Sequence, residues 1–198
     1  MPIAKGSPYG EPAPVPEGLV LVRSDAEARA VLEDARRERR AYPTLGLLGG
    51  DLCHTLGGGS GPELTGVRFP VDLGVVLADG RLHLFVAHLV ARTRLWTRAF
   101  AAMNAQWLGE WNLGPRAHPN DGLLVTYDVH LKPGQLAAVR SRLPHGTHLP
   151  HPGIQERRAP AVQVDLDREL PLRLDGEAIG RARVLSVRVE PDALVVFV

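Results

Sequence analysis

The sequence is poor in the features that mark several common classes of protein. It has a single cysteine, Cys53, among 198 residues, which excludes an internal disulfide and a cysteine-rich metal site. No apolar stretch approaches the roughly 18 residues of a membrane-spanning helix. The N-terminus also lacks the charged, apolar and small-residue order of a signal peptide. We therefore expect a cytoplasmic protein without a transmembrane segment.

An excess of charge of one sign is also lacking. The 23 basic and 22 acidic residues leave a formal net charge of +1, and they are spread along the chain without a basic run. Binding to nucleic acid needs a clustered positive surface that contacts phosphates. We therefore expect no nucleic-acid partner.

Glycine and proline, in contrast, are plentiful. The chain has 21 Gly and 17 Pro beside 44% hydrophobic residues. Together Gly and Pro make up about a fifth of the chain, below the roughly 25–30% typical of low-complexity disorder. These residues are more typical of turns between many short elements, and they favour a β-rich fold.

The first third of the sequence indicates an arm followed by one small α/β unit. Residues 1–17 are rich in Pro and Gly and predict a flexible arm. Within residues 18–62, an apolar strand precedes a helix whose first residues, Ser24 and Glu27, have capping-box spacing. A second short strand then runs into glycines, which completes one β-α-β unit.

From residue 63 onward the pattern changes to alternating apolar and polar residues, which is typical of β-strands. Asp79-Gly80 stands between two such stretches and predicts a tight hairpin. One helix is expected over residues 133–143. We therefore predict an α+β protein that is mostly β: a short β-α-β unit followed by an antiparallel β-sandwich over residues 63–198.

Several short segments carry side chains that could do chemistry, and each has a structural alternative. Asp175-Gly176-Glu177 reads as a hairpin turn, but a carboxylate at a strand bend can be a general base. Asp121 is a turn residue by default, and it could also bind a hard cation with backbone carbonyls. The glycine-rich loop that contains Gly49 and Gly50 either connects two elements or binds phosphate through its N–H groups.

Histidine and cysteine offer two further alternatives. His145, His148 and His151 could hold zinc, although the surrounding prolines predict an irregular loop. Cys53 and His54 could be a nucleophile and a base, but adjacent side chains seldom point at each other. Cys53 is more typical of a small hydrophobic residue in a core.

Several stretches taken together resemble one family, the bacterial diacylglycerol kinase-like lipid kinases, which share a fold with NAD kinases. The likeness extends over about residues 114–198 and is thin before them. The stretches that carry it are GPRAHPNDGLLVTYDV, HGTHLPHPGIQERRA and LPLRLDGEAIGRARVLSVRVEPDALVVFV. LGLLGGDLCHTLGG also looks like a shortened form of the family's GTGNDxAxxLG loop.

The resemblance implies two lobes with an active site in the cleft between them. It places Glu177 at the position of the base that activates a lipid hydroxyl. Asp121 and the backbone of Leu123 take the positions of a structural magnesium site. Asp51, together with Gly49 and Gly50, would be the remnant of a phosphate loop, with Asp51 in the magnesium-linked network near the nucleotide.

The departures from the family pattern concern the nucleotide. The family's GGDGT motif does not occur, and residues 18–62 hold about one of the several β-α-β units that a nucleotide-binding lobe needs. We therefore expect magnesium as the candidate cofactor and no ATP binding without a partner. Our first hypothesis is a reduced, non-catalytic relative that binds a lipid-like molecule or a partner protein in the remnant interlobe cleft. The alternatives are an active lipid kinase completed by a homodimer or another chain, and a structural assembly module.

Overall fold

The computed structural model describes residues 9–59 and 64–198. The N-terminal elements in chain order are β1 (Glu11–Pro12), β2 (Val20–Val22), α1 (Asp25–Arg37), β3 (Leu45–Leu47) and α2 (Asp51–Thr55). The strands that follow are β4 (Val67–Ala78), β5 (Arg81–Phe85), β6 (His88–Arg92), β7 (Arg98–Met103) and β8 (Leu124–His130). The chain ends with α3 (Leu136–Arg142) between two short 3-10 turns, then β9 (Ile154–Ala159), β10 (Ala161–Leu174) and β11 (Glu177–Phe197).

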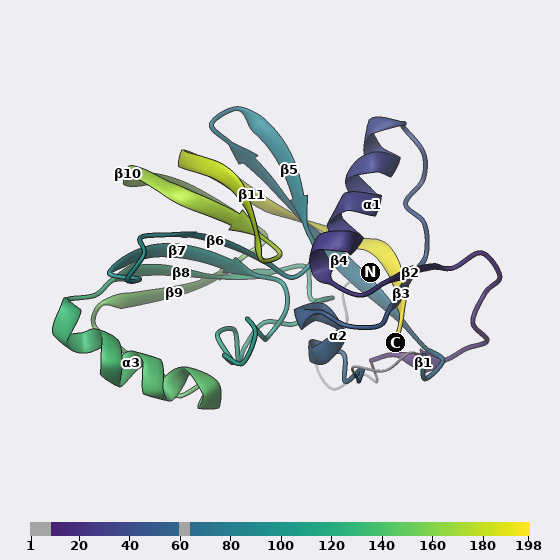
Figure 1. The fold of residues 1–198 in the computed structure, drawn as a ribbon, viewed down its shortest axis with the longest axis horizontal. Helices are drawn as coiled ribbons and strands as arrows, with labels where there is room; N and C mark the ends of the chain where they lie inside the picture. The colour runs from purple at the N-terminus through teal and green to yellow at the C-terminus, as the bar shows by residue number, and fades with distance from the viewer. Residues whose placement is uncertain (1–8, 60–63) are drawn as a thin grey trace.

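The described strands belong to one continuous sheet. Its main path runs β1-β4-β11-β10-β6-β7-β8-β9, with β5 beside β4 and with β3 beside β11. Apart from the parallel β2–β3 and β3–β11 pairs, the neighbours are antiparallel. The sheet folds over itself, so that β5, β10 and β11 lie above β6–β9 in Figure 1. The predicted class, mostly β with a sandwich after a short β-α-β unit, is confirmed.

The interior of the sandwich is filled by alternate side chains of the two layers. Phe85, Phe100 and Leu124 are at most 2% exposed and pack with leucines of β10 and β11. Burial of such side chains stabilises the fold by roughly 1.5–3 kcal/mol each. The apolar alternation therefore predicts the buried face of β10 and β11. β7 is instead buried on both faces, one in the sandwich interior and the other in the cluster that includes Val139 of α3.

The last two strands are longer than the sequence pattern suggests. The stretches 161–166 and 170–174, which look like separate strands, form the single strand β10 with a shift in register between Asp165 and Leu170. β11 likewise continues through a shift between Glu190 and Leu194. A bulge lets a strand continue past residues that would otherwise end it.

The β-α-β unit packs at one end of the sheet. Ser24 caps α1 by accepting a hydrogen bond from the N–H of Glu27 at 3.2 Å, as the capping-box spacing predicts. β2 and β3 are parallel, and β3 continues the sheet beside the C-terminal end of β11. The first strands of the chain and the last therefore lie side by side (Figure 1).

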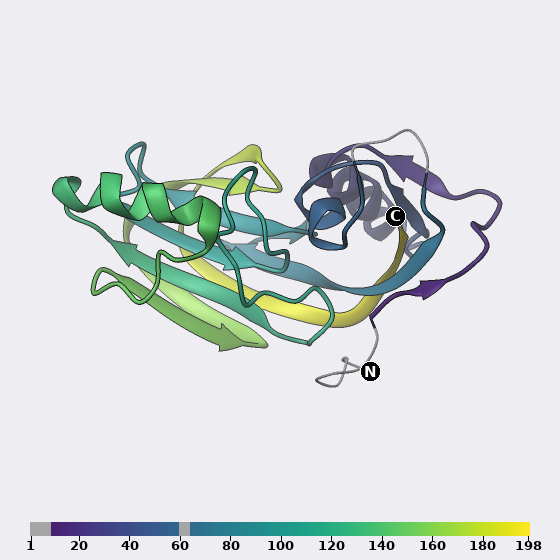
Figure 2. The same ribbon diagram turned by 90° about the horizontal axis from the view of Figure 1, so that it is seen from below.

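Two further segments cover the sheet. Within the predicted N-terminal arm, residues 1–8 lie outside the described residues, while Glu11 and Pro12 pair with β4. α3 lies over β6–β9 (Figure 2), on the face that points away from the sandwich interior. It buries Val139 and Leu143 against these strands. None of the helices in the described ranges has the length and apolar character that crossing a membrane requires.

Candidate functional site

The Asp175-Gly176 turn carries a buried carboxylate. Both residues have positive φ angles, 50° and 83°, as a tight hairpin turn requires. The Asp175 side chain points into the protein and accepts hydrogen bonds from the N–H groups of Val86, Ala87 and His88 at 2.9–3.1 Å. The turn prediction is therefore confirmed, but this carboxylate also holds together the junction between β5 and β6.

Glu177, the candidate base, begins β11 at the edge of this turn. Its side chain is 62% exposed and forms an ion pair with Arg29 of α1. Arg29 is itself 7% exposed, and its Nε lies 3.8 Å from the Asp175 carboxylate. The arginine therefore bridges one buried and one exposed carboxylate, and it ties α1 to the hairpin.

Asp25, the first residue of α1, directs its carboxylate at the N-terminus of the short helix α2. Its carboxylate accepts hydrogen bonds from the N–H groups of Asp51 at 2.6 Å and Leu52 at 3.2 Å. Gly50 has a φ of 98°, and a Cβ atom there would lie 2.6 Å from Asp25 Oδ1. A Cβ atom on Gly49 would lie 2.7 Å from the carbonyl oxygen of Arg23. The glycines of the predicted phosphate loop thus allow close internal packing, and an acidic side chain of the protein takes the loop's N–H groups.

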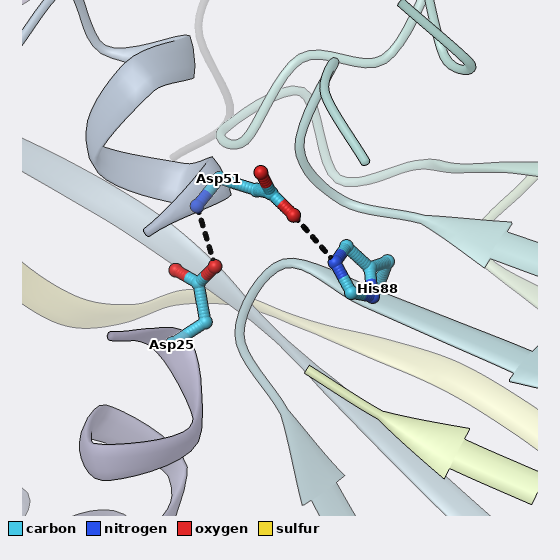
Figure 3. Close-up of side chains that lie close together, drawn as sticks. All are labelled: Asp25, Asp51 and His88. Carbon is cyan, nitrogen blue, oxygen red and sulfur yellow. Dashed lines mark hydrogen bonds and ion pairs between the residues drawn. The ribbon is translucent and has the colours of Figure 1, made fainter. Parts of the chain in front are cut away.

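Asp51 connects this loop to the sheet. Its Oδ2 lies 2.8 Å from Nε2 of His88, the first residue of β6, and its Oδ1 accepts a hydrogen bond from the N–H of Gly109. Figure 3 shows Asp25 turned toward the backbone of Asp51 and the Asp51 carboxylate turned toward the imidazole. We refer to Asp25, Asp51 and His88 as the aspartate–histidine cluster.

The pKa values of the cluster reflect burial and mutual charge. Burial, together with the nearby Asp175 carboxylate, raises the pKa of Asp25 to about 7. Burial would raise the pKa of Asp51, but the hydrogen bond and charge of His88 outweigh it and lower the value. Burial would lower the pKa of His88, whereas the carboxylates of Asp51 and Asp175 raise it. The Asp51–His88 pair is therefore best described as carboxylate and imidazolium.

This cluster predicts a specific dependence of stability on pH. An unfolded Asp titrates near 3.9, so folded Asp25 holds its proton more tightly, and its contribution to stability decreases as pH rises from about 4 to 7. The raised pKa of His88 acts in the same direction above its unfolded value of about 6.5. We expect the free energy of unfolding to fall by roughly 2 kcal/mol between pH 5 and pH 8.

Urea denaturation across this pH range measures the effect. Asp25→Asn removes one titrating group and is expected to flatten the decrease. Asp34→Asn changes an exposed carboxylate of the same helix and serves as the matched control. An Asp25→Asn protein that keeps the full wild-type slope would contradict this assignment.

Among the described residues, the aspartate–histidine cluster is the group of side chains whose spacing could suit a metal ion. Its ligand atoms all lie within 4.8 Å of one another. Carboxylate and imidazole can bind a divalent cation when the imidazole is neutral. The raised pKa of His88 favours the imidazolium, which supplies positive charge to Asp51 without a metal. The cluster as arranged therefore does not favour magnesium.

Asp121 and Leu123, the predicted magnesium site, lie away from this cluster in the loop before β8. The Asp121 carboxylate accepts hydrogen bonds from the N–H of Leu123 at 3.0 Å and from the guanidinium of Arg158. An arginine thus provides the positive charge that a cation would bring, and this donor set does not fit a magnesium ion well. Magnesium at this site stays a prediction.

The other candidate side chains have structural surroundings. Cys53 is buried, its Sγ lies 3.4 Å from the Leu47 carbonyl oxygen, and burial raises the pKa of its thiol. His54 stacks on Trp107 with ring centroids 4.4 Å apart. Among the described residues, the three histidines of the 145–151 loop do not form a group with metal-ligand spacing.

An apolar cavity of about 150 Å³ lies between α3 and the sheet. Its walls include Ala101 of β7, Tyr127 of β8 and Val139 of α3. His148, 1% exposed, also lines it, and neither ring nitrogen of this histidine has a hydrogen-bond partner among the described residues. We call this space the helix-covered cavity. A buried, unpartnered imidazole in an apolar wall is the arrangement expected where a ligand brings a polar group.

A more open groove of about 510 Å³ adjoins the cavity and leads toward the aspartate–histidine cluster. His88, Gly109 and Gly176 line the end of the groove near the cluster. Arg94, Trp96, Trp111 and Arg140 line both the groove and the helix-covered cavity. The two spaces therefore lie side by side and share these four side chains as a common wall.

Sequence reasoning thus identified some residues of this region and missed others. Asp51 and Glu177 come from distant segments, and the structure connects them through Arg29, Asp175 and His88. The sequence pattern alone does not predict Arg29 or His88 as site residues. The available signals were a histidine inside an apolar strand and an arginine on the apolar side of a helix.

Comparison with known proteins gives a family and a fold. Residues 75–198 match the model of a family described as the YegS C-terminal NAD kinase beta sandwich-like domain. Two solved structures, both of a proposed diacylglycerol kinase from Bacillus anthracis str. Sterne, have similar folds. One has a TM-score of 0.62 at 15% identity and covers 90% of this chain and 76% of its own. The other has a TM-score of 0.58 at 14% identity, with 88% and 83% covered. No curated protein sequence matches this chain significantly.

Proposed function

This chain belongs to the family of the YegS C-terminal NAD kinase beta sandwich-like domain, and on that premise we propose that it is a non-catalytic relative of lipid kinases that binds a lipid-like ligand. The proposed binding site is the helix-covered cavity with the adjoining groove. One end of this groove is lined by His88 and Gly176. Because His88 pairs with Asp51 of the β-α-β unit, the proposed site would adjoin the remnant of the interlobe cleft.

The helix-covered cavity is the observation that supports ligand binding most directly. An apolar cavity of roughly this volume accepts a hydrocarbon about the size of benzene. The walls from α3 and the sheet would therefore contact the end of an acyl chain, and the rest of the ligand would lie in the groove. His148 offers that ligand one buried polar contact.

The absence of catalysis that we propose follows from the phosphate loop. Phosphoryl transfer needs a positioned phosphate donor as well as a base. The N–H groups of Asp51 and Leu52, which such a loop would direct at phosphate, already bond to the Asp25 carboxylate. A carboxylate at this position also repels an anionic phosphate. Glu177 stays a candidate general base, and the loop that would position its phosphate donor is bonded to Asp25 instead.

Titration calorimetry with two probes tests the proposal. We expect monooleoylglycerol below its critical micelle concentration to bind, and ATP with magnesium not to bind. ATP-dependent labelling of a lipid hydroxyl that is lost in Glu177→Gln would instead support the active-kinase alternative. If neither probe binds and light scattering shows a defined oligomer, the assembly-module alternative would replace the proposal.

A cavity-filling variant tests the location of the site. Ala101→Leu adds three carbons at a wall residue that is 1% exposed, and it should weaken monooleoylglycerol binding by at least about tenfold. Because the added atoms enter existing space, the melting temperature should not fall. Ala137→Leu makes the same change at an exposed position of α3 and should leave binding unchanged. Equal binding by both variants would place the ligand elsewhere.

A further inference from the structure

The groove beside the helix-covered cavity is lined by positive charge. Four arginines contribute to it: Arg92 of β6, Arg94 of the loop after β6, Arg140 of α3 and Arg173 of β10. Glu110 is the single carboxylate among the lining residues. The lining side chains therefore carry a formal charge of about +3 when His88 is left out of the sum. We call this surface the arginine groove.

These arginines lack carboxylate partners within the described residues. The contacts of Arg92 are to backbone carbonyls, at 3.2 Å to Thr93 and 3.1 Å to Arg94. Arg173 likewise donates to the carbonyl of Gly176. Elsewhere on the protein, arginines such as Arg98 and Arg183 are paired with aspartates. Four guanidinium groups without a carboxylate partner among the described residues thus line one groove, which favours an anionic ligand.

Aromatic rings hold two of these guanidinium groups in position. Arg92 lies over Trp96 at 4.8 Å from the ring centroid, and Arg140 lies over Trp111 at 5.4 Å. The two tryptophans pack edge to face with centroids 5.4 Å apart. Cation–π contacts of this kind hold a guanidinium group in a fixed orientation. The groove is therefore organised for recognition before a ligand arrives.

The loop between β6 and β7 contributes a second unusual feature. Trp96 has a φ of 61°, a left-handed conformation that bulky residues rarely adopt. Leu95, at 64% exposure, is the most exposed of the large hydrophobic residues described, and it lines the mouth of the helix-covered cavity. The loop thus presents an arginine, an apolar side chain and an indole ring in succession at the junction of groove and cavity. This arrangement matches a ligand with an anionic end and an apolar end.

We propose that the arginine groove binds the phosphate monoester head group of a single-chain amphiphile whose hydrocarbon end enters the helix-covered cavity. This inference rests on the proposed function and specifies its ligand class. A phosphate monoester carries about −1.5 to −2 charges at neutral pH, so it balances a lining of about +3 better than a carboxylate does. Guanidinium groups also match phosphate oxygens in bidentate geometry.

Calorimetry on the full chain with matched probes tests the head group. The probes are 1-oleoyl lysophosphatidic acid, monooleoylglycerol with the same chain, oleate and inorganic phosphate. The three probes with a hydrocarbon chain are used below their critical micelle concentrations. We expect the phosphorylated lipid to bind at least about tenfold more tightly than the neutral lipid in low salt, and this ratio to decrease as salt rises. Oleate should fall between them, and inorganic phosphate should bind weakly because it lacks the chain.

Charge-reversal variants locate the interaction. Because only the phosphorylated lipid carries charge, Arg140→Glu should weaken its binding at least about tenfold more than it weakens binding of the neutral lipid. Arg142→Glu reverses a charge on the same helix but outside the groove lining, and it should have little effect on either lipid. If Arg142→Glu weakened binding as much as Arg140→Glu, general electrostatic attraction would replace a specific site.

The outcomes separate this inference from the proposed function. Equal affinity for the phosphorylated and neutral lipids would leave the cavity function intact and overturn the head-group inference. Binding of inorganic phosphate without binding of either lipid would support an anion site and overturn the cavity function. Binding only to vesicles that contain anionic lipid, and never to the monomeric probes, would overturn both in favour of a membrane-surface contact.

Discussion

Asp175→Ala is expected to lower the free energy of unfolding by about 4 kcal/mol, as measured by urea denaturation. The substitution removes the acceptor for three buried backbone N–H groups, those of residues 86–88. Each unsatisfied buried donor costs about 1–3 kcal/mol, with some relief from relaxation. The junction between β5 and β6, and with it the position of His88, depends on this one carboxylate.

The chain contains a matched control for this experiment. Asp79 stands in the other Asp-Gly hairpin, also with a positive φ, and accepts hydrogen bonds from the N–H groups of Arg183 and Val184. The backbone strain of alanine at a positive φ is therefore similar in both turns. Because Asp79 is exposed, water can replace its hydrogen bonds, and Asp79→Ala should be clearly less destabilising. Equal losses would show that burial is not the cause.

Arg29→Met is the second change for which we expect a large effect, a loss of about 3 kcal/mol in the free energy of unfolding. Methionine keeps an apolar stem in the buried position but removes the charge beside the Asp175 carboxylate. Removal of one partner from a buried ion pair leaves an uncompensated charge, which costs about 3–5 kcal/mol in other proteins. Urea denaturation at pH 7 measures the loss.

Glu177→Gln separates the buried pair from the exposed one. It removes the ion pair between Arg29 and a side chain that is 62% exposed, and such pairs contribute about 0–1 kcal/mol. We therefore expect near wild-type stability. If Glu177→Gln destabilised the protein as much as Arg29→Met, the pair with Glu177 would be the more important of the two.

These side chains together attach the β-α-β unit to the sandwich. Arg29 of α1 contacts the Asp175 turn, Asp25 bonds to the loop before α2, and Asp51 reaches His88 of β6. The two parts also share a hydrophobic core, in which Leu32 of α1 clusters with Leu73 of β4 and Val196 of β11. The buried charges add specific polar contacts to that core at the end where His88 lines the groove. The contacts of Asp51 with His88 and of Asp175 with the β5–β6 junction therefore help to set the shape of the arginine groove.

Much of the fold could be predicted from the order of residues alone. The alternation of apolar residues sets the buried face of β10 and β11, because neighbouring side chains point to opposite sides. Asp79-Gly80 and Asp175-Gly176 specify turns, since both positions require positive φ angles. Ser24 and Glu27 mark the start of α1.

The contacts that form the candidate site, in contrast, could not be predicted from local sequence, because they join distant segments of the chain. Local sequence describes Asp175 as a turn residue, because nothing near it shows that its carboxylate will meet the N–H groups of residues 86–88. The arginine groove draws on a loop, a helix and two strands, which approach only when the sheet folds over itself. The sequence by itself determined the strands, turns and family resemblance through local spacing. Only the tertiary structure decided which charges are buried, which are paired and which face a common groove, because those properties depend on contacts between distant segments.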